Sequence, residues 1–196
     1  MWAGHAISLS SDGTIEIRPE RPADRDAVDE VHRAAFADHG AQVAGLVEGL
    51  RDLISDHRGV SLVAVAGGRV IGHVMLTPSL LDAPRALVTV QVLSPLGVLP
   101  AAQRRGVGSA MVRRGVEIVI GQGAPIVFLE GNPAYYSRLG FVAGASLGYR
   151  RPSLRIPRAF QGDEPPRPRI MDDGNARLLS CLLGTTMRSV CAGGRP

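Results

Sequence analysis

The sequence predicts a single mixed α/β (α+β) domain, in which helices pack against a mixed sheet. The chain has 196 residues, which is enough for one domain with a substantial core. Hydrophobic residues make up 45% and the mean hydropathy is +0.10, so the composition is that of a folded chain. Strand-like and helix-like segments follow one another in the order β α α β β β α β α β, without an internal repeat.

The first elements are predicted from alternating apolar and polar residues, from the positions of prolines and from apolar residues at helical spacing. Residues 14–18, TIEIR, alternate like a short strand that the following prolines end. Asp24 is expected to cap a helix over residues 25–37. A second helix is expected over residues 42–54, which place their apolar side chains on one face.

The central segments are expected to build most of the sheet. Two β-rich runs flank Gly67–Gly68, which is a strong hairpin signal. Residues 86–99 form an apolar strand interrupted by Ser94–Pro95, where we expect a bulge or bend. A helix over 109–119 and a buried strand over 124–129 follow.

The last elements are shorter. Asn132–Pro133 opens a helical turn with the sequence AYYSRL, which Gly140 ends. Phe141 then begins another strand.

Composition excludes several classes of function. The net charge is +4, but residues 1–149 carry 13 arginines against 14 acidic residues, so the basic excess belongs to the C-terminal part. With 4% aromatic residues, the composition also argues against a nucleic-acid platform. The cysteines and histidines show no metal-ligand spacing, so no metal site is expected. No apolar run is long enough to span a membrane and the first residues lack a signal-peptide pattern, which predicts a cytoplasmic protein.

The stretch AAQRRGVGSAM, residues 101–111, lies where a strand is expected to end and a helix to begin. A helix start offers unpaired N–H groups and the positive end of the helix dipole, and glycine lets an oxyanion come close. Arg104 and Arg105 add positive charge. The segment therefore predicts a phosphate site, although the same residues also fit a tight turn with solvated arginines.

Two other phosphate motifs fit poorly. A P-loop requires a lysine, and this chain has none. A dinucleotide-binding fingerprint would have glycine where Met111 stands, and it would lie in an early βαβ unit.

The same residues resemble a known family. QRRGVG, residues 103–108, is similar to the Q/R-x-x-G-x-G/A motif of the GNAT superfamily of N-acetyltransferases. HRAAF, GLVEGLR, SLVAV, VIGHVML, LGVLPAAQRRGVGSAMV and GNPAYYSRLGF resemble, in this order, the YhbS-like group of predicted acetyltransferases. The resemblance covers residues 14–160 and implies the acyl-CoA N-acyltransferase fold.

The resemblance also implies a cofactor and its site. Acetyl-CoA would place its pyrophosphate on the loop 103–108, and strand 96–99 would splay apart from strand 125–129. Main-chain groups of the first strand would pair with the pantetheine arm, and the N–H of Val98 would polarise the thioester carbonyl. The implied cofactor-binding residues are Gly97, Val98, Leu99, Gln103, Arg104, Arg105, Gly106, Val107, Gly108, Ser109 and Asn132.

Transfer to an amine requires an acid for the leaving thiolate and a base for the amine. Tyr136 stands where the family places its acid tyrosine, and Tyr135 is the alternate. The simpler interpretation of Tyr136 is a buried core tyrosine without a catalytic role. Glu130 is the candidate base, and it fits an exposed strand-end acid equally well. His73 and His32 could also face the acceptor, but a half-buried strand histidine and a solvated helix histidine explain them more simply.

These features predict an acetyl-CoA-dependent N-acetyltransferase that acts directly on an amine of a small molecule or protein. The alternatives are a non-catalytic module that binds CoA or a partner, and a basic nucleic-acid-binding protein. The acceptor is not specified by the fold.

The C-terminal part departs from the family. Residues 1–13 are expected to be a flexible N-terminus, 14–160 the domain and 161–196 an atypical Arg/Pro-rich tail. The family ending, similar to G-T-L-V-Y and A-F-W, is absent, but GNARLLSCLLG back-translated with free codon choice and read one base over is compatible with GTLVYSPAFW. A frameshift would leave the last strand missing or altered and an edge prone to self-association, for instance as a homodimer. The rival interpretation is an evolved basic arm.

Overall fold

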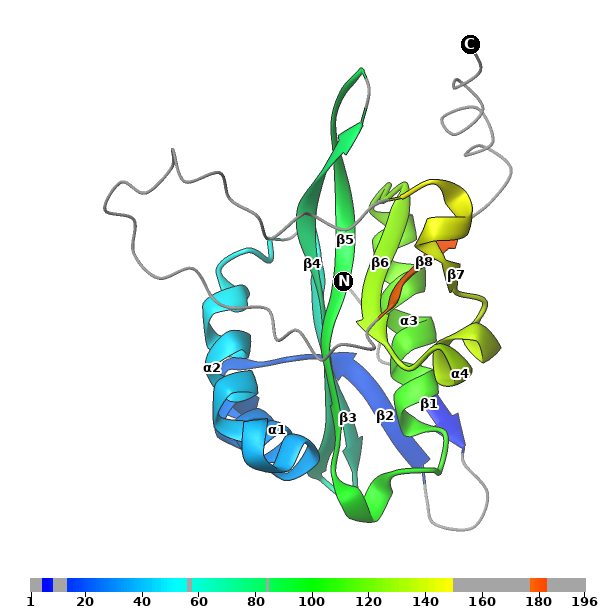
Figure 1. The fold of residues 1–196 in the computed structure, drawn as a ribbon. Helices are drawn as coiled ribbons and strands as arrows, with labels where there is room; N and C mark the ends of the chain where they lie inside the picture. The colour runs from blue at the N-terminus through cyan, green and yellow to red at the C-terminus, as the bar shows by residue number, and fades with distance from the viewer. Residues whose placement is uncertain (1–4, 9–13, 56–57, 84, 150–176, 183–196) are drawn as a thin grey trace.

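The computed structural model describes residues 5–8, 14–55, 58–83, 85–149 and 177–182. One mixed sheet forms the middle layer, with α1 and α2 on one face and α3 on the other (Figure 1). The helices are α1 (Arg25–Phe36), α2 (Gly40–Arg51), α3 (Val107–Gly121) and α4 (Pro133–Tyr136). The strands are β1 (His5–Ser8), β2 (Thr14–Pro19), β3 (Val60–Ala66), β4 (Arg69–Ala83), β5 (Ala86–Val98), β6 (Ile126–Gly131), β7 (Val142–Ala143) and β8 (Arg177–Leu182).

The strand order in the sheet is β1-β2-β3-β4-β5-β6-β8-β7. The first five strands pair antiparallel with their neighbours in the sequence. β6 pairs parallel with β5, because α3 carries the chain back across the sheet between them. This architecture confirms the predicted mixed α/β class.

The elements predicted from local patterns are present. β3 and β4 meet at Gly67–Gly68, both of which have positive φ angles as the hairpin signal requires. Asp24 lies at the start of α1 but does not cap it with its side chain. Its carboxylate instead accepts hydrogen bonds from the guanidinium of Arg18 at 2.7 and 2.8 Å and from the main-chain N–H of Arg21 at 2.7 Å. The carboxylate of Asp24 therefore links β2 to the turn that follows it.

The core is divided by the sheet into two main clusters. One cluster lies under α3, where Met111 and Val119 pack on Leu62, Leu76 and Leu129. The other lies under α1 and α2, where Val28, Val31 and Val47 pack on Val63 and Met75. Both faces are apolar at the centre, so the middle strands are nearly continuous hydrophobic runs.

β4 and β5 are irregular where the sequence predicted it. Val74 pairs with Leu96 and Leu76 pairs with Leu93, so Ser94 and Pro95 together lie opposite one residue of β4. This bulge bends β5. Beyond it, β5 stays paired with β4 but has left β6, since the β5–β6 ladder ends at Leu93 and Leu129.

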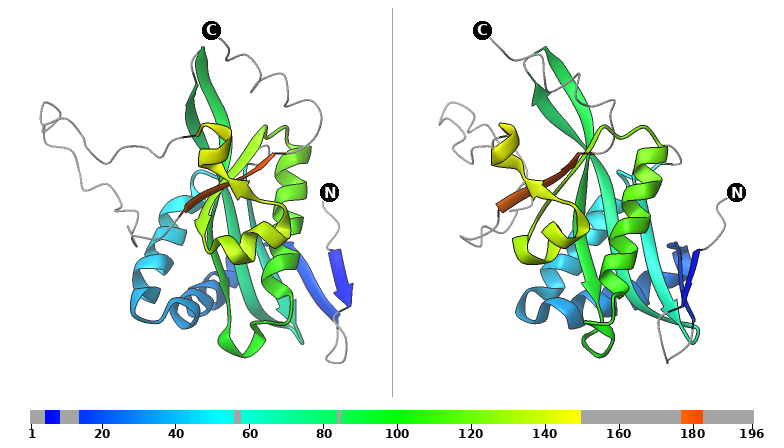
Figure 2. Two further views of the ribbon diagram at one scale, coloured as in Figure 1. Left: turned by 45° about the vertical axis from the view of Figure 1, so that its right-hand side comes forward. Right: turned by 90° about the vertical axis from the view of Figure 1, so that its right-hand side faces the viewer.

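Two terminal strands differ from the expectations. His5–Ser8 pairs with β2, whereas residues 1–13 were expected to be flexible. Arg177–Leu182 lies antiparallel between β6 and β7, so a strand occupies the position where a missing or altered last strand was expected (Figure 2). It is formed by the segment RLLSCL, within the stretch whose neighbouring reading frame is compatible with the family ending. The remainder of 1–13 and of the expected tail lies outside the described residues.

Candidate functional site

The first turn of α3 has main-chain N–H groups that no hydrogen bond within the helix uses. Gly106 has a φ of 81°, a conformation that suits glycine, and it provides no side chain to cap the helix. The helical hydrogen bonds begin with Ala110, whose N–H donates to the carbonyl of Gly106 at 3.0 Å. The N–H groups of Val107, Gly108 and Ser109 precede this bond, as expected for the first turn of a helix. Together with the helix dipole, they form a site suited to an oxyanion.

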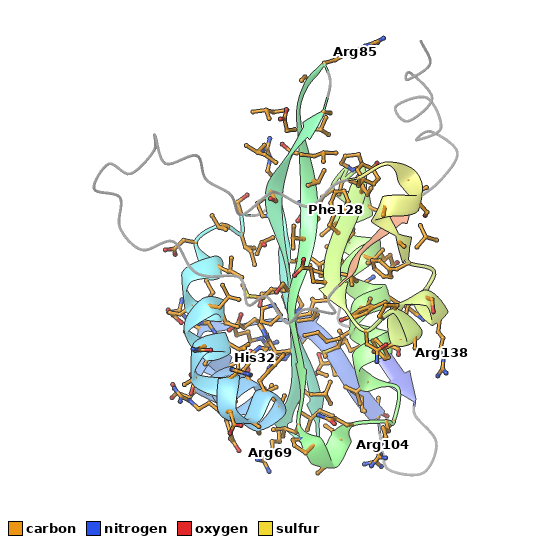
Figure 3. The ribbon with its side chains drawn as sticks, in the orientation of Figure 1. His32, Arg69, Arg85, Arg104, Phe128 and Arg138 are labelled. Carbon is orange, nitrogen blue, oxygen red and sulfur yellow. The ribbon has the colours of Figure 1, made fainter. Side chains whose placement is uncertain are left out.

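The loop before α3 is exposed and positively charged. Arg104 has a φ of 60°, and the side chains of Arg104 and Arg105 are exposed. Figure 3 shows Arg104 beside the start of α3. Gln103 donates a hydrogen bond from its side-chain amide to the carbonyl of Val98 at 2.9 Å. The loop is therefore tied to the end of β5.

Three residues at the end of β5 were predicted to contact the cofactor. Only one of them, Val98, directs its main-chain N–H into the gap where β5 and β6 separate. The N–H of Leu99 donates to the carbonyl of Ile71 at 2.9 Å, and its carbonyl accepts from Ala102 at 2.8 Å. Main-chain groups alternate in direction along a strand, so Gly97 also faces β4 and the N–H of Val98 points away from it. The main-chain groups of Gly97 and Leu99 are thus directed toward β4 and the adjoining turn, and the predicted contact of this segment with a pantetheine arm stays a prediction.

α4 brings two tyrosines to this region. The side chain of Asn132 accepts a hydrogen bond from Ala134 N at 2.9 Å and so caps α4. The hydroxyl of Tyr135 lies 3.1 Å from the Ser109 hydroxyl. A Cβ built on Gly108 would lie 2.9 Å from that Tyr135 oxygen. Tyr135 therefore reaches the start of α3.

Tyr136 lies deeper, at the end of β6. It is 8% exposed and packs edge-on against Phe141, with ring centroids 5.8 Å apart. A Cβ on Gly131 would lie 2.4 Å from its ring, so this glycine makes the space for it. Burial raises the pKa of Tyr136 to about 12, and the neighbouring Tyr135 adds to the shift. The phenol therefore keeps its proton throughout the neutral range.

The candidate acids and bases lie on different faces of the sheet. Leu129 faces α3 and packs with Tyr136. Glu130 is exposed and, by strand alternation, shares the opposite face with Phe128. Glu130 and Tyr136 thus flank the end of β6 from both sides.

His32 and His73, which are separate candidates in the sequence, lie in contact in the structure. His32 Nε2 and His73 Nδ1 are 2.7 Å apart, and both side chains are completely buried. His73 Nε2 lies 2.8 Å from the hydroxyl of Ser61 and 3.5 Å from a carboxylate oxygen of Glu20. No sequence signal linked these residues, because they are far apart in the chain and belong to different elements.

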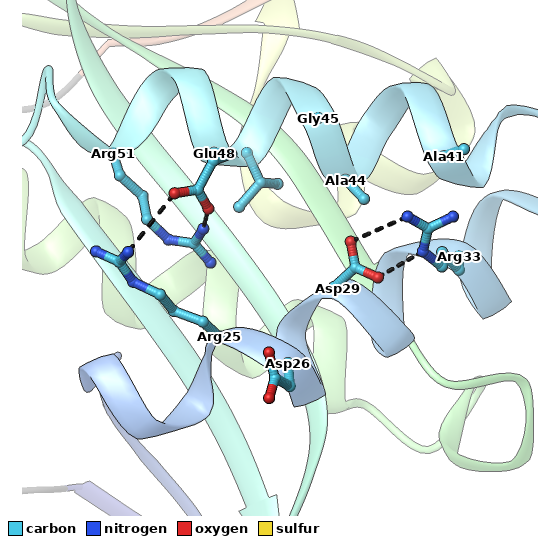
Figure 4. A pocket seen from close by; sticks show the side chains of 10 residues that line it. Arg25, Asp26, Asp29, Arg33, Ala41, Ala44, Gly45, Glu48 and Arg51 are labelled. Carbon is cyan, nitrogen blue, oxygen red and sulfur yellow. Dashed lines mark hydrogen bonds and ion pairs between the residues drawn. The ribbon is translucent and has the colours of Figure 1, made fainter.

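Charged residues also line a groove between α1 and α2 (Figure 4). Arg25 and Arg51 both pair with Glu48, and Arg33 pairs with Asp29. None of the predicted cofactor residues lines this groove. Most of its charges are paired, so it carries no functional assignment.

The described part of the chain has neither a metal-binding cluster nor a membrane-spanning helix. Among those residues, no group of histidine, cysteine and acidic side chains is arranged to hold a metal ion. Within the same ranges, no helix has the length and apolarity needed to cross a bilayer.

Comparisons with known proteins identify the family. The model of the acetyltransferase (GNAT) domain matches residues 16–144. The N-acetyltransferase YjhQ of Escherichia coli, itself uncharacterised, is 32% identical over 131 residues, which are 66% of this chain and 71% of YjhQ.

Solved structures agree. A GNAT acetyltransferase from Brucella melitensis in complex with acetyl-CoA is 35% identical, with a TM-score of 0.58 over 66% of this chain and 84% of that one. The E. coli GNAT protein YhbS in complex with CoA has a TM-score of 0.67 over 98% of this chain and 88% of its own, and at 24% identity it supports the fold. The chain belongs to the GNAT acetyltransferase family.

Proposed function

We propose that this protein is an acetyl-CoA-dependent N-acetyltransferase that passes the acetyl group directly to an amine of a small molecule or a protein. The observation that carries the proposal is the start of α3, where three main-chain N–H groups precede the first helical hydrogen bond beside a gap in the sheet. The similar Brucella acetyltransferase was crystallised with acetyl-CoA, which supports the same ligand here.

The residues at the start of α3 fit the pyrophosphate of CoA. The N–H groups of Val107, Gly108 and Ser109 would donate to its oxygens, and Arg104 and Arg105 would balance its charge. No side chain at Gly106 or Gly108 obstructs the approach. The hydroxyl of Tyr135 is also near enough to contribute, and Asn132, whose side chain caps α4, stays a candidate from the family resemblance.

Acetyl-CoA supplies an activated acetyl group as a thioester. In the proposed reaction, the N–H of Val98 donates to the carbonyl oxygen and stabilises the negative charge that develops there. The hydroxyl of Tyr136 gives its proton to the leaving sulfur, and its raised pKa keeps that proton available at neutral pH. Glu130, on the other face of β6, is a candidate to receive the proton of the amine.

The experiment has two parts. Acetyl-CoA is first titrated into the protein by calorimetry, and turnover with a panel of amines is then measured for the wild type and for Tyr136→Phe. We expect binding, turnover and a loss in kcat of roughly 10²- to 10⁴-fold in the variant, as for the removal of a general acid. Tyr149→Phe is the matched control, because Tyr149 packs on Phe128 at 5.1 Å rather than at α3.

The outcomes separate the alternatives. Binding without turnover on any amine would show a non-catalytic CoA-binding module. Absence of binding at millimolar acetyl-CoA would contradict both assignments. Full turnover by Tyr136→Phe would contradict the role of Tyr136, and Tyr135→Phe would then be tested in its place.

A further inference from the structure

The segment that carries the proposed oxyanion donor is paired along one edge only. β5 has left β6 before residues 96–98, so this segment pairs with β4 alone, and Gly97 lies opposite His73. A donor stabilises an oxyanion only within hydrogen-bond distance of it, about 2.7–3.1 Å. The contacts that the two faces of the sheet make with this segment therefore decide where the N–H of Val98 lies.

Helices approach the segment from both faces through two glycines. A Cβ on Gly97 would lie 2.8 Å from His32 Nδ1, so glycine lets the ring of this α1 residue lie against the strand. A Cβ on Gly72, which pairs with Val98, would lie 2.9 Å from Met111 Cε on α3. The segment is thus enclosed between an imidazole on one face and a flexible thioether on the other.

A chain of hydrogen bonds holds the imidazole of His32. Arg51 on α2 donates to one carboxylate oxygen of Glu20 at 2.7 and 3.1 Å. The Ser61 hydroxyl donates to the other oxygen at 2.5 Å and lies 2.8 Å from His73 Nε2. His73 Nδ1 lies 2.7 Å from His32 Nε2. The chain therefore ties α1 to β4, β3 and α2.

The charge of Glu20 determines which atom donates in each bond. Burial raises the pKa of Glu20, but hydrogen bonds from His73, Arg51 and Ser61 outweigh it and lower that pKa to about 2. Because Ser61 donates to Glu20, its oxygen accepts from His73 Nε2, and His73 Nδ1 accepts from His32 Nε2. Burial lowers the pKa of both histidines, to about 3 for His32, so both rings are neutral at pH 7.

This arrangement does not serve stability. The Nδ1 atom of His32 is left as a buried acceptor, and no described residue provides it with a hydrogen-bond partner. A buried acceptor without a partner lowers stability, whereas a pair of hydrogen-bonded side chains replaced together by apolar ones of similar shape costs little. A hydrogen-bonded pair has a fixed direction that apolar packing lacks. The polar pair therefore points to a requirement for geometry.

We propose that His32 and His73 are positioning residues, and that their hydrogen-bonded pair fixes Gly97 and thereby directs the N–H of Val98 toward the thioester carbonyl. Both rings are completely buried, so they act through the strand and not by contact with a substrate. This inference rests on the proposed function, which gives Val98 its role. A displacement of about 1 Å at a reacting group can cost roughly 10²-fold in rate.

The first test replaces the pair with apolar side chains. The double variant His32→Leu/His73→Val removes both partners together, and Ser61 can still donate to Glu20. We expect the free energy of unfolding at pH 7 and the affinity for CoA to stay at the wild-type values, whereas kcat falls roughly 10- to 10²-fold. A general loss of structure would lower all three.

Single variants provide the rescue and the control. In His32→Gln the side-chain amide can replace the Nε2 donor toward His73, so this variant should keep most of the wild-type kcat. His32→Leu leaves His73 Nδ1 without its donor and should lose kcat. His39→Leu is the matched control, because His39 is exposed at the start of α2.

The second test does not need turnover. Backbone amide shifts of each ¹⁵N-labelled protein are compared before and after acetyl-CoA is added, so the effect of the missing rings on the free protein cancels. In the wild type, acetyl-CoA should change the shifts of Val98 and of Val107, Gly108 and Ser109. In the double variant the changes at the start of α3 should remain, and the change at Val98 should be diminished.

Each outcome decides the inference. Wild-type kcat in the double variant, or an undiminished response of Val98, would overturn it. A folded double variant that is less stable and binds CoA more weakly would show a structural role, which also overturns it. If the double variant does not fold, equal kcat in His32→Leu and His32→Gln would overturn it. A wild type that binds acetyl-CoA but acetylates no amine overturns the proposed function alone, because the response of Val98 still decides the positioning.

Discussion

Lowering the pH from 7.5 to 5 should destabilise the protein through its two buried histidines. Both have a pKa below the ordinary value of 6.5, because burial disfavours the charged ring. The unfolded chain gains protons on these residues below pH 6.5, whereas the folded protein keeps the rings neutral. Stability is therefore complete above pH 6.5 and is lost as the pH falls toward the folded pKa, which is about 3 for His32.

The magnitude follows from the distance between the pH and the ordinary pKa. At pH 5, His32 alone should cost about 2 kcal/mol, at about 1.4 kcal/mol for each pH unit below 6.5. His73 adds to this loss in the same direction. Glu20 contributes little in this window, since its stabilisation is present above its ordinary pKa of 4.5 and is lost as the pH falls from there toward 2.

The assay is urea unfolding at several pH values between 7.5 and 5 for the wild type and for His32→Gln. The wild type should lose stability across the range, and the variant should lose about 2 kcal/mol less than the wild type over the same range. His39→Gln should retain the wild-type slope. Equal wild-type stability at pH 7.5 and 5, or an unchanged slope in His32→Gln, would refute the account of a neutral buried histidine.

Three further changes have expected results. Gly106→Ala should reduce stability by about 1 kcal/mol in urea unfolding and weaken acetyl-CoA binding in calorimetry, because its φ is 81°; Gly49→Ala, an exposed helical position with nothing within 4 Å, should leave the affinity unchanged. Gly131→Ala should lower kcat and stability together, since the added carbon would lie 2.4 Å from the Tyr136 ring; wild-type values in both assays would contradict this packing. Sequencing the gene through the codons of residues 160–184 should show the family ending in the neighbouring frame, and nucleotides that cannot encode it would exclude a frameshift.

Features that depend on neighbouring residues were predictable from the sequence. The hairpin at Gly67–Gly68, the bulge at Ser94–Pro95 and the helix after Gly106 are each determined by a short segment. The motif resemblance added the order of the strands around the gap, which local patterns do not give.

Features that depend on tertiary packing were not predictable. A difference of one residue in helical phase decides that Tyr135 reaches Ser109 while Tyr136 packs beneath it, and periodicity locates an element only to within a few residues. The partners of His32 and His73 are separated by long stretches of chain, so no spacing pattern connects them. Single histidines were therefore given the simpler interpretation, although together they form a buried network.

The central claim is that the start of α3 binds the pyrophosphate of acetyl-CoA. The most direct test is an NMR titration of the ¹⁵N-labelled protein with acetyl-CoA, in which backbone amide shifts are followed residue by residue. The account predicts the largest changes at Val107, Gly108 and Ser109, with a further change at Val98. Changes concentrated in the groove between α1 and α2, or none at all, would contradict it.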